Sequence, residues 1–276
     1  MTIKTIASFL GGTPLKEPEV FAPLVSPNHV GIELELEGCG KMPPINVYWA
    51  NKGDGSLRIE GVEYYFSKPL AGEDVWNAIK LMHKACAVGN PNPSEYCSTH
   101  VHIDFLNNTV KECCMFLFTH MLFEDALAQY WGPNRADNLF CLTSSNAEQS
   151  GNIISRMYHL DDIRFLRDVG EHNIKYSAMN FFPLIRFGTI ESRIAGPITH
   201  MDEMLAWVNT LLAIKKFSLT LKTPDDLLRV CSQLGTNGLF REVLGDALYS
   251  EYAEFIDDSN IYEAIDRIQF ILYNKQ

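Results

Sequence analysis

Four stretches of the sequence alternate ionisable and apolar residues, which is the pattern of a β-strand with one face in a core. These stretches predict strands at about residues 30–36, 61–67, 99–105 and 186–194. Side chains two positions apart on a strand point the same way. If the four strands share one sheet, their ionisable side chains gather on one side of it. This set is Glu33, Glu35, Glu37, Glu63, Tyr65, His100, His102, Asp104, Glu191 and Arg193, with Arg186 at the start of the fourth strand.

Such a set predicts a divalent-metal site that handles phosphate. Carboxylates at this density do not stay ionised together without cations. Oxygen-rich ligand sets favour Mg²⁺ or Mn²⁺, and Mg²⁺ commonly bridges to phosphate groups. Arg193 lies two positions from Glu191, and a guanidinium binds two phosphate oxygens at once. A solvated sheet face alternates in the same way on any one strand, but four strands with this mix favour a site.

The bulk composition excludes some classes of function. The 276 residues carry a net charge of -11, which disfavours sequence-blind binding of nucleic acid because that needs basic residues. Seven cysteines without a CxxC pair indicate reduced thiols, and no secretory signal peptide is recognisable. The longest apolar run, residues 113–123, is too short to span a membrane. We therefore expect a cytoplasmic protein without a membrane partner.

The rest of the chain predicts helices around an antiparallel sheet, an α+β fold in which one sheet face is ionisable and binds ligand. Helices are expected at 72–88, 109–130, 201–220, 224–234 and from about 260, and a turn at 51–55. Thr109 and Glu112 match a capping box, and His120 is expected to be a hydrogen-bonded core residue. We expect one catalytic domain over 1–276, with an N-terminal arm or loop at 1–28, a helical insertion at 106–175 and a helical C-terminal part at 200–276.

Several common catalytic motifs are missing from the sequence. It contains no GxxxxGK[ST] phosphate loop and no GxGxxG, HExxH or GxSxG motif. No cysteine has the surroundings of a catalytic nucleophile. A nucleotide site in this chain would therefore have to be built from the strand residues.

Taken in order, five segments resemble the amidoligase family: GIELELEG, DGSLR, GVEYYFSKPL, THVHID and KYSAMNFFPLIRFGTIESRIAGP. That family, common in phages and bacteria, belongs with glutamine synthetase and glutamate–cysteine ligase among the carboxylate–amine ligases. The resemblance covers about residues 29–198. It implies a glutamine-synthetase-like sheet that binds ATP and magnesium, with manganese as an alternative.

The resemblance also implies roles for individual residues. The implied metal ligands are Glu33, Glu35, Glu63, His100 and Glu191. The implied catalytic residues are Arg193, Glu191, His102 and Asp54, the last from the DGS turn. The implied cofactor-binding residues are Arg193, His102, Lys175, Arg186 and Asn180.

The implied reaction joins a carboxylate to an amine. ATP phosphorylates the carboxylate of a small molecule or peptide, and an amine displaces phosphate from the acyl phosphate to give an amide or isopeptide. One alternative is a metal-dependent hydrolase that uses the same cluster. Another is an inactive binding protein, which the full set of site residues disfavours. An oligomer is compatible with the sequence. Glu35→Ala and Glu191→Ala are each expected to lose metal-dependent nucleotide binding while the fold stays intact or gains stability.

Overall fold

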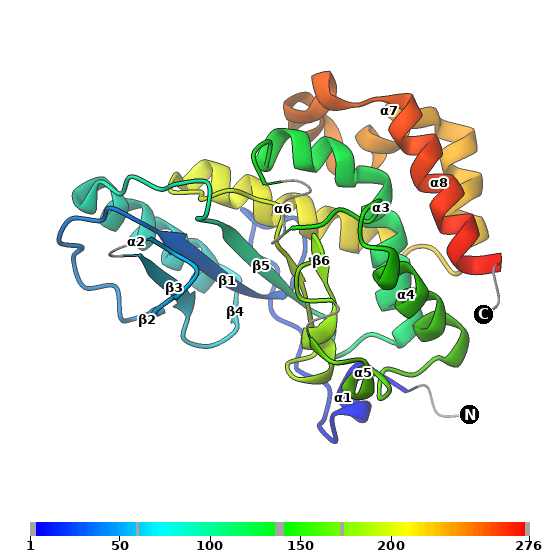
Figure 1. The fold of residues 1–276 in the computed structure, drawn as a ribbon, viewed down its shortest axis with the longest axis horizontal. Coiled ribbons are helices and arrows are strands. Elements are labelled where there is room, and N and C mark those ends of the chain that lie inside the picture. Colours follow the sequence, from blue (N-terminus) through cyan, green and yellow to red (C-terminus); the bar gives the residue numbers. More distant parts are fainter. Residues whose placement is uncertain (1–3, 59–60, 136–140, 172–173, 274–276) are drawn as a thin grey trace.

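The computed structural model has the α+β architecture expected from the sequence (Figure 1), and it describes residues 4–58, 61–135, 141–171 and 174–273. The strands are β1 (His29–Leu36), β2 (Trp49–Gly53), β3 (Val62–Phe66), β4 (Leu70–Ala71), β5 (Thr99–Asp104), β6 (Met179–Asn180) and β7 (Thr189–Ser192). The α-helices are α1 (Ile6–Phe9), α2 (Glu73–Gly89), α3 (Val110–Trp131), α4 (Glu148–Leu160), α5 (Leu166–Val169), α6 (Met201–Ser218), α7 (Pro224–Tyr252) and α8 (Asp258–Tyr273). The 3-10 helices given for the described residues are η2 (Phe182–Ile185) and η3 (Ala253–Phe255).

The seven strands form one open sheet in the order β2-β3-β1-β5-β7-β6, with β4 paired to β1. All six strand pairings are antiparallel, as predicted. The two central strands, β1 and β5, are the two with the clearest alternation in the sequence. Three of the predicted strands lie side by side as β3, β1 and β5, and the fourth follows as β7.

One predicted strand and one predicted turn were wrong in their bounds. The fourth strand does not start at Arg186, because Phe182–Ile185 form the 3-10 helix η2 and Gly188 turns the chain with φ +71° before β7. A side chain at Gly188 would collide with Leu106. The predicted turn at 51–55 begins later, because residues up to Gly53 pair with β3 as strand β2.

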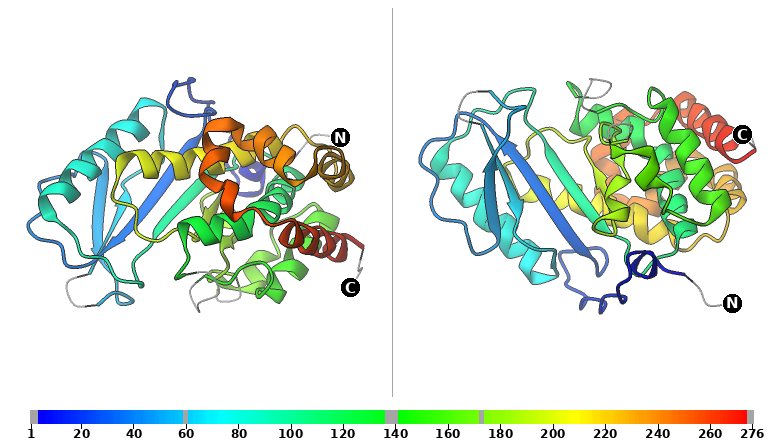
Figure 2. Two further views of the ribbon diagram at one scale, coloured as in Figure 1. Left: turned by 90° about the horizontal axis from the view of Figure 1, so that it is seen from above. Right: turned by 60° about the horizontal axis from the view of Figure 1, so that its bottom comes forward.

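The apolar face of the sheet is covered by helices α2 and α6 (Figure 2). Ile32, Leu34, Val101 and Ile103 point into this layer and are at most 1% exposed. The indole N–H of Trp49 donates a 2.9 Å hydrogen bond to the Ala78 carbonyl, which fixes β2 against α2. With one face buried in this way, the register of each strand is set, and the carboxylate, histidine and lysine side chains of the strands are directed to the other face.

Helices α3, α4, α7 and α8 pack beside the sheet and form the second half of the molecule (Figure 1). The predicted capping box at the start of α3 is confirmed, since Thr109 and Glu112 bond to each other's backbone N–H. The first segment of α7 ends as predicted at residue 234, because Gly235 leaves the helical conformation with φ +64°, and further segments follow up to Tyr252 with a second break at Gly245. In the part of the chain described, no helix is both long and apolar enough to cross a membrane.

The described part of the predicted N-terminal arm or loop, residues 4–28, contains one short helix. Helix α1 buries Ile6 and Ala7 completely. The backbone N–H groups of these two residues donate to the carbonyls of Asn108 and Leu106. The start of the chain is thereby attached to the loop between β5 and α3.

His120 is buried in α3 as predicted, but the predicted hydrogen bond is missing. Its side chain is 0% exposed, and neither ring nitrogen has a hydrogen-bond partner among the described residues. Burial lowers the pKa of His120 to about 3. The native protein therefore holds a neutral imidazole in its interior.

We expect His120→Leu to stabilise the protein by about 1–2 kcal/mol at neutral pH, because it removes two unsatisfied polar atoms. Since the unfolded histidine takes up a proton below a pKa of about 6.5 and native His120 does not, wild-type stability falls by about 1.4 kcal/mol per pH unit below that value. Urea unfolding at pH 7.5 and pH 5 measures both effects. As a control, His200→Gln, a change at an exposed histidine, should keep the wild-type dependence of stability on pH. If His120→Leu lost stability with falling pH as steeply as the wild type, His120 would not be the buried neutral histidine responsible.

Candidate functional site

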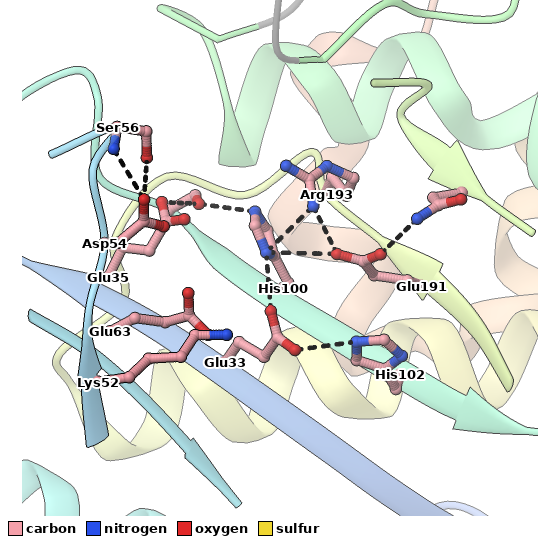
Figure 3. Close-up of polar contacts among 12 residues, drawn as sticks. Glu33, Glu35, Lys52, Asp54, Ser56, Glu63, His100, His102, Glu191 and Arg193 are labelled. Atoms are coloured by element: carbon pink, nitrogen blue, oxygen red, sulfur yellow. Dashed lines mark hydrogen bonds and ion pairs between the residues drawn. The ribbon is translucent and has the colours of Figure 1, made fainter. Parts of the chain in front are cut away.

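The antiparallel register brings the ionisable residues together in rows across the ligand face (Figure 3). In the first row Lys52 on β2 faces Glu63 on β3, which faces Glu35 on β1. Residues directly opposite each other have Cβ atoms about 4.5–5.5 Å apart, so their side chains interact. The ammonium group of Lys52 lies 2.9 Å from a Glu63 carboxylate oxygen.

Two further rows run parallel to the first. Glu33 on β1 faces Tyr65 on β3 and His100 on β5. One step along, His102 faces Glu191 on β7, and Glu191 in turn faces Asn180 on β6. Four ionisable residues of these rows, Glu35, Glu63, His100 and Glu191, are each at most 7% exposed.

Glu35, Asp54 and Glu63 form the first group of candidate cation ligands. One carboxylate oxygen of each lies within 4.8 Å of the others. Asp54 is oriented by the turn after β2, where it accepts 2.8 Å hydrogen bonds from the backbone N–H and the hydroxyl of Ser56. Burial, with the negative charges of Glu33 and Asp54, raises the pKa of Glu63 to about 7 although Lys52 opposes the shift. A divalent cation here would relieve this repulsion.

Glu33, His102 and Glu191 form the second group, again with one ligand atom each within 4.8 Å. Burial raises the pKa of Glu33, but hydrogen bonds and positive charge from His100 and His102 outweigh it and hold this pKa well below its usual range. Burial lowers the pKa of His102, yet its hydrogen bond to Glu33 and the charge of Glu191 raise it overall. The two groups lie next to each other because Glu33 and Glu35 are two positions apart on β1.

Glu191 is held from two sides. The Arg193 guanidinium donates to one of its carboxylate oxygens at 2.6 Å, and the Asn180 amide donates to the other at 2.7 Å. Burial raises the pKa of Glu191, but the charges of Arg193 and His102 lower it overall. Arg193 keeps its Nε–H without a protein partner among the described residues. The pair thus presents a fixed carboxylate next to a guanidinium that has donor capacity left.

Ser98, which sequence reasoning missed, connects the two groups. Its hydroxyl donates to Glu35 and lies 2.7 Å from Nε2 of His100. A serine has only one hydroxyl hydrogen, so with that hydrogen on Glu35 the His100 Nε2–H must be the donor to Ser98. Nδ1 of His100 then faces Glu33 at 3.4 Å and Glu191 at 3.3 Å. A ring nitrogen between two carboxylates is placed to coordinate a cation bound among them.

We expect Ser98→Ala to remove the hydrogen bond that keeps a proton on Nε2 of His100, so that this tautomer is no longer fixed. Divalent-metal binding should weaken by about tenfold, as it usually does when a metal ligand loses its hydrogen-bond partner. Long-range ¹H–¹⁵N spectra of the metal-free protein report the tautomer, and a Mn²⁺ titration reports the affinity. The matched control is Ser218→Ala, another serine that is 0% exposed with one hydroxyl hydrogen bond. An unchanged His100 tautomer in Ser98→Ala would refute this role.

Every residue to which the resemblance assigns a role lines one cavity of about 320 Å³, which we call the carboxylate cavity, whereas Glu37, Tyr65 and Asp104 of the predicted ionisable set do not line it. The residues with an assigned role are Glu33, Glu35, Asp54, Glu63, His100, His102, Lys175, Asn180, Arg186, Glu191 and Arg193. Lys175 and Arg186 reach it from the irregular segment before β7, not from a strand. Arg186 pairs with Glu171 at 3.1 Å and lies over the Phe182 ring. Three basic side chains therefore share a cavity with two groups of cation ligands.

No protein-family model matches the chain, and a search of curated proteins finds no match. The candidate site is therefore supported by its own geometry.

The sequence prediction did not include three residues that contact the predicted site residues: Lys52, Ser56 and Ser98. Ser98 could have been found by continuing the alternation of His102 and His100 one step back along the strand. Lys52 was hidden in a segment of turn-like composition. Its pairing with Glu63 depends on the β2–β3 register, which the local sequence does not specify.

Proposed function

We propose that this chain is an ATP- and magnesium-dependent carboxylate–amine ligase with a glutamine-synthetase-like sheet. The observation that carries the proposal is the carboxylate cavity, in which two groups of three cation ligands lie next to three basic side chains. Cation ligands alone would suit many metal enzymes. Basic side chains in the same cavity add the complement for a polyphosphate.

The residues fit magnesium by their chemistry. Glu35, Asp54 and Glu63 supply only oxygen ligands, which Mg²⁺ prefers. Glu33, His102 and Glu191 supply two carboxylates and an imidazole, a set that also suits Mn²⁺. Magnesium bound there would neutralise the carboxylates and polarise phosphoryl oxygens.

The basic residues are arranged to hold phosphate. Arg193 is fixed by Glu191 and offers its remaining donors to the cavity, so it can stabilise charge on the transferred phosphoryl group. Lys175 and Arg186 line the same cavity from the segment before β7 and would bind the other phosphates. The protein contributes positioning and charge neutralisation, and no side chain has to act as a covalent nucleophile.

The proposed reaction has two steps. A carboxylate oxygen of the acid attacks the γ-phosphorus of ATP, the bond from that phosphorus to the bridging oxygen breaks, and ADP leaves. The amine nitrogen of the second substrate then attacks the carbonyl carbon of the acyl phosphate. The C–N bond forms, the C–O bond to phosphate breaks, and phosphate leaves with the proton lost by the nitrogen.

Trapping with hydroxylamine tests this function without knowledge of the natural amine. The protein is incubated with ATP, Mg²⁺, hydroxylamine and a pool of amino acids and short peptides as carboxylates. We expect hydroxamate and ADP to form together and only when a carboxylate, ATP and Mg²⁺ are all present. Cleavage of amide or phosphate-ester substrates without any nucleotide would instead identify a metal-dependent hydrolase.

A further inference from the structure

A second cavity of about 310 Å³ adjoins the carboxylate cavity on the ligand face. The two share Glu33, His102 and Phe187 in their linings. Gly31 lies on the floor of the second cavity, in the β1 position between His29 and Glu33 that points to the ligand face, and it faces His102 across the strand pair. Because glycine has no side chain, the ridge of large side chains along β1 is interrupted there. The gap opens directly beside Glu33.

The walls of this cavity are mostly apolar and are partly left in water. Phe187 is 64% exposed and Leu15 is 38% exposed, and Tyr65 and Leu106 complete the wall. Large apolar side chains around a hollow next to a charged cluster indicate a ligand site. The volume is near the lower end of small-molecule pockets, about 300–1,000 Å³, so the occupant is a small molecule or a single side chain.

The two cavities differ in where their basic side chains lie. Lys175, Arg186 and Arg193 line the carboxylate cavity, and none of them lines the second one. The second cavity instead has Glu33 at the shared boundary and Asp104 beyond it, with Lys68 as its one Lys or Arg lining residue among those described. The phosphates of a nucleotide therefore match the first cavity, where the three basic side chains lie beside the cation ligands, and a single cationic head matches the second cavity at Glu33.

Two of the three hydroxyl groups in the second cavity, those of Ser67 and Thr189 but not that of Tyr65, already have a partner within the protein. Ser67 donates to the Tyr48 carbonyl at 3.1 Å, and the Thr189 hydroxyl lies 3.1 Å from Nδ1 of His102. A nucleobase needs hydrogen-bond partners along its edge, and this lining provides few. An apolar body with one cationic head directed at Glu33 matches the lining better.

We propose that this second cavity, the acceptor cavity, binds the amine substrate and selects primary amines that carry an apolar aliphatic or aromatic body. The inference rests on the proposed ligase function. The apolar body lies over Gly31 against Phe187 and Leu15, and the nitrogen points across Glu33 into the carboxylate cavity, where the acyl group is formed.

Binding of 2-phenylethylamine tests the proposal in protein free of metal and nucleotide. The comparison ligands are ethylamine, which lacks the ring, 3-phenylpropanoate, which reverses the charge, and adenosine. By NMR titration we expect 2-phenylethylamine to bind at least about tenfold more tightly than each of them, because it alone combines a ring for the apolar wall with a cationic head for Glu33. Phe187→Ala should lose most of this advantage, whereas Phe270→Ala, which removes a similarly exposed ring on α8, should keep it.

Several outcomes would overturn the proposal. Tighter binding of adenosine would make this a nucleobase cavity, and tighter binding of 3-phenylpropanoate would make it a subsite for the acid. The proposal would also be refuted if all four ligands bound equally well or if none bound. It would be refuted as well if Phe270→Ala weakened the binding of 2-phenylethylamine as much as Phe187→Ala does. Because no ATP or Mg²⁺ is present, failure of this titration is distinguishable from failure of the ligase function, which the magnesium-dependent binding of ATP tests separately.

Discussion

Glu191→Gln is expected to weaken magnesium-dependent binding of ATP by on the order of 100-fold or more, because the variant loses a cation ligand and the charge that fixes Arg193. Glu191 accepts hydrogen bonds from Arg193 and Asn180 and belongs to the candidate ligand group with Glu33 and His102. Calorimetric titration of ATP in the presence of Mg²⁺ measures the loss. Glu242→Gln, the same change at an exposed position of α7, should bind as the wild type does.

The structure revises the stability expected for the alanine variant at this position. From the sequence, Glu191→Ala should leave the fold intact or more stable, since like charges are removed. In the structure Glu191 is the hydrogen-bonded partner of Arg193, and their side chains are only 6% and 16% exposed. Removing one partner of a buried pair costs about 3–5 kcal/mol. The glutamine variant retains an oxygen acceptor, so it separates loss of ligand binding from loss of fold; normal magnesium-dependent ATP binding by this variant would refute the metal assignment.

Glu35→Gln is expected to remove one of two bound divalent ions and to stabilise the metal-free protein by about 1–2 kcal/mol, since two unit charges about 4–5 Å apart repel strongly at the low effective dielectric of a protein. One carboxylate oxygen of Glu35 lies within 4.8 Å of a carboxylate oxygen of Asp54 and of one of Glu63. The variant keeps an oxygen acceptor for the Ser98 hydroxyl, so the contact to His100 is preserved. Stability rises here and not at Glu191, because Glu35 has no arginine partner among the described salt bridges.

Electron paramagnetic resonance with Mn²⁺ measures the number of ions, and thermal unfolding without metal measures the stability. The wild type should bind two Mn²⁺ ions and Glu35→Gln one. Asp246→Asn, which removes a carboxylate from α7 outside the carboxylate cavity, is the matched control and should still bind two. Two ions in Glu35→Gln, or a lower metal-free stability, would contradict the grouping of Glu35 with Asp54 and Glu63.

The central strands were predictable because their alternation is long and local. The segment with Glu33 and Glu35 and the segment with His100 and His102 each bury every second residue, so their ionisable side chains had to share a face. The strand with Lys52 was missed, since its composition is that of a turn and its pairing with β3 is non-local. Strand β7 is shorter than predicted because a 3-10 helix and Gly188 precede it.

The site was predictable in its residue types but not in its internal contacts. The contact of Ser98 with both Glu35 and His100 depends on the β1–β5 register and on side-chain geometry, neither of which a single sequence specifies. Lys175 and Arg186 lie in irregular backbone, so periodicity could not place them. Their presence in the carboxylate cavity follows from the path of the chain before β7. The ligase function and the glutamine-synthetase-like fold remain predictions.

The most direct test of the ligase proposal is calorimetric titration of ATP into the wild-type protein with and without Mg²⁺. We predict binding that requires both, and no such binding in Glu191→Gln. A response to divalent metal alone, with none to ATP, would contradict the ligase and favour the hydrolase. No response to either would indicate that this chain binds its ligands without catalysis of this kind.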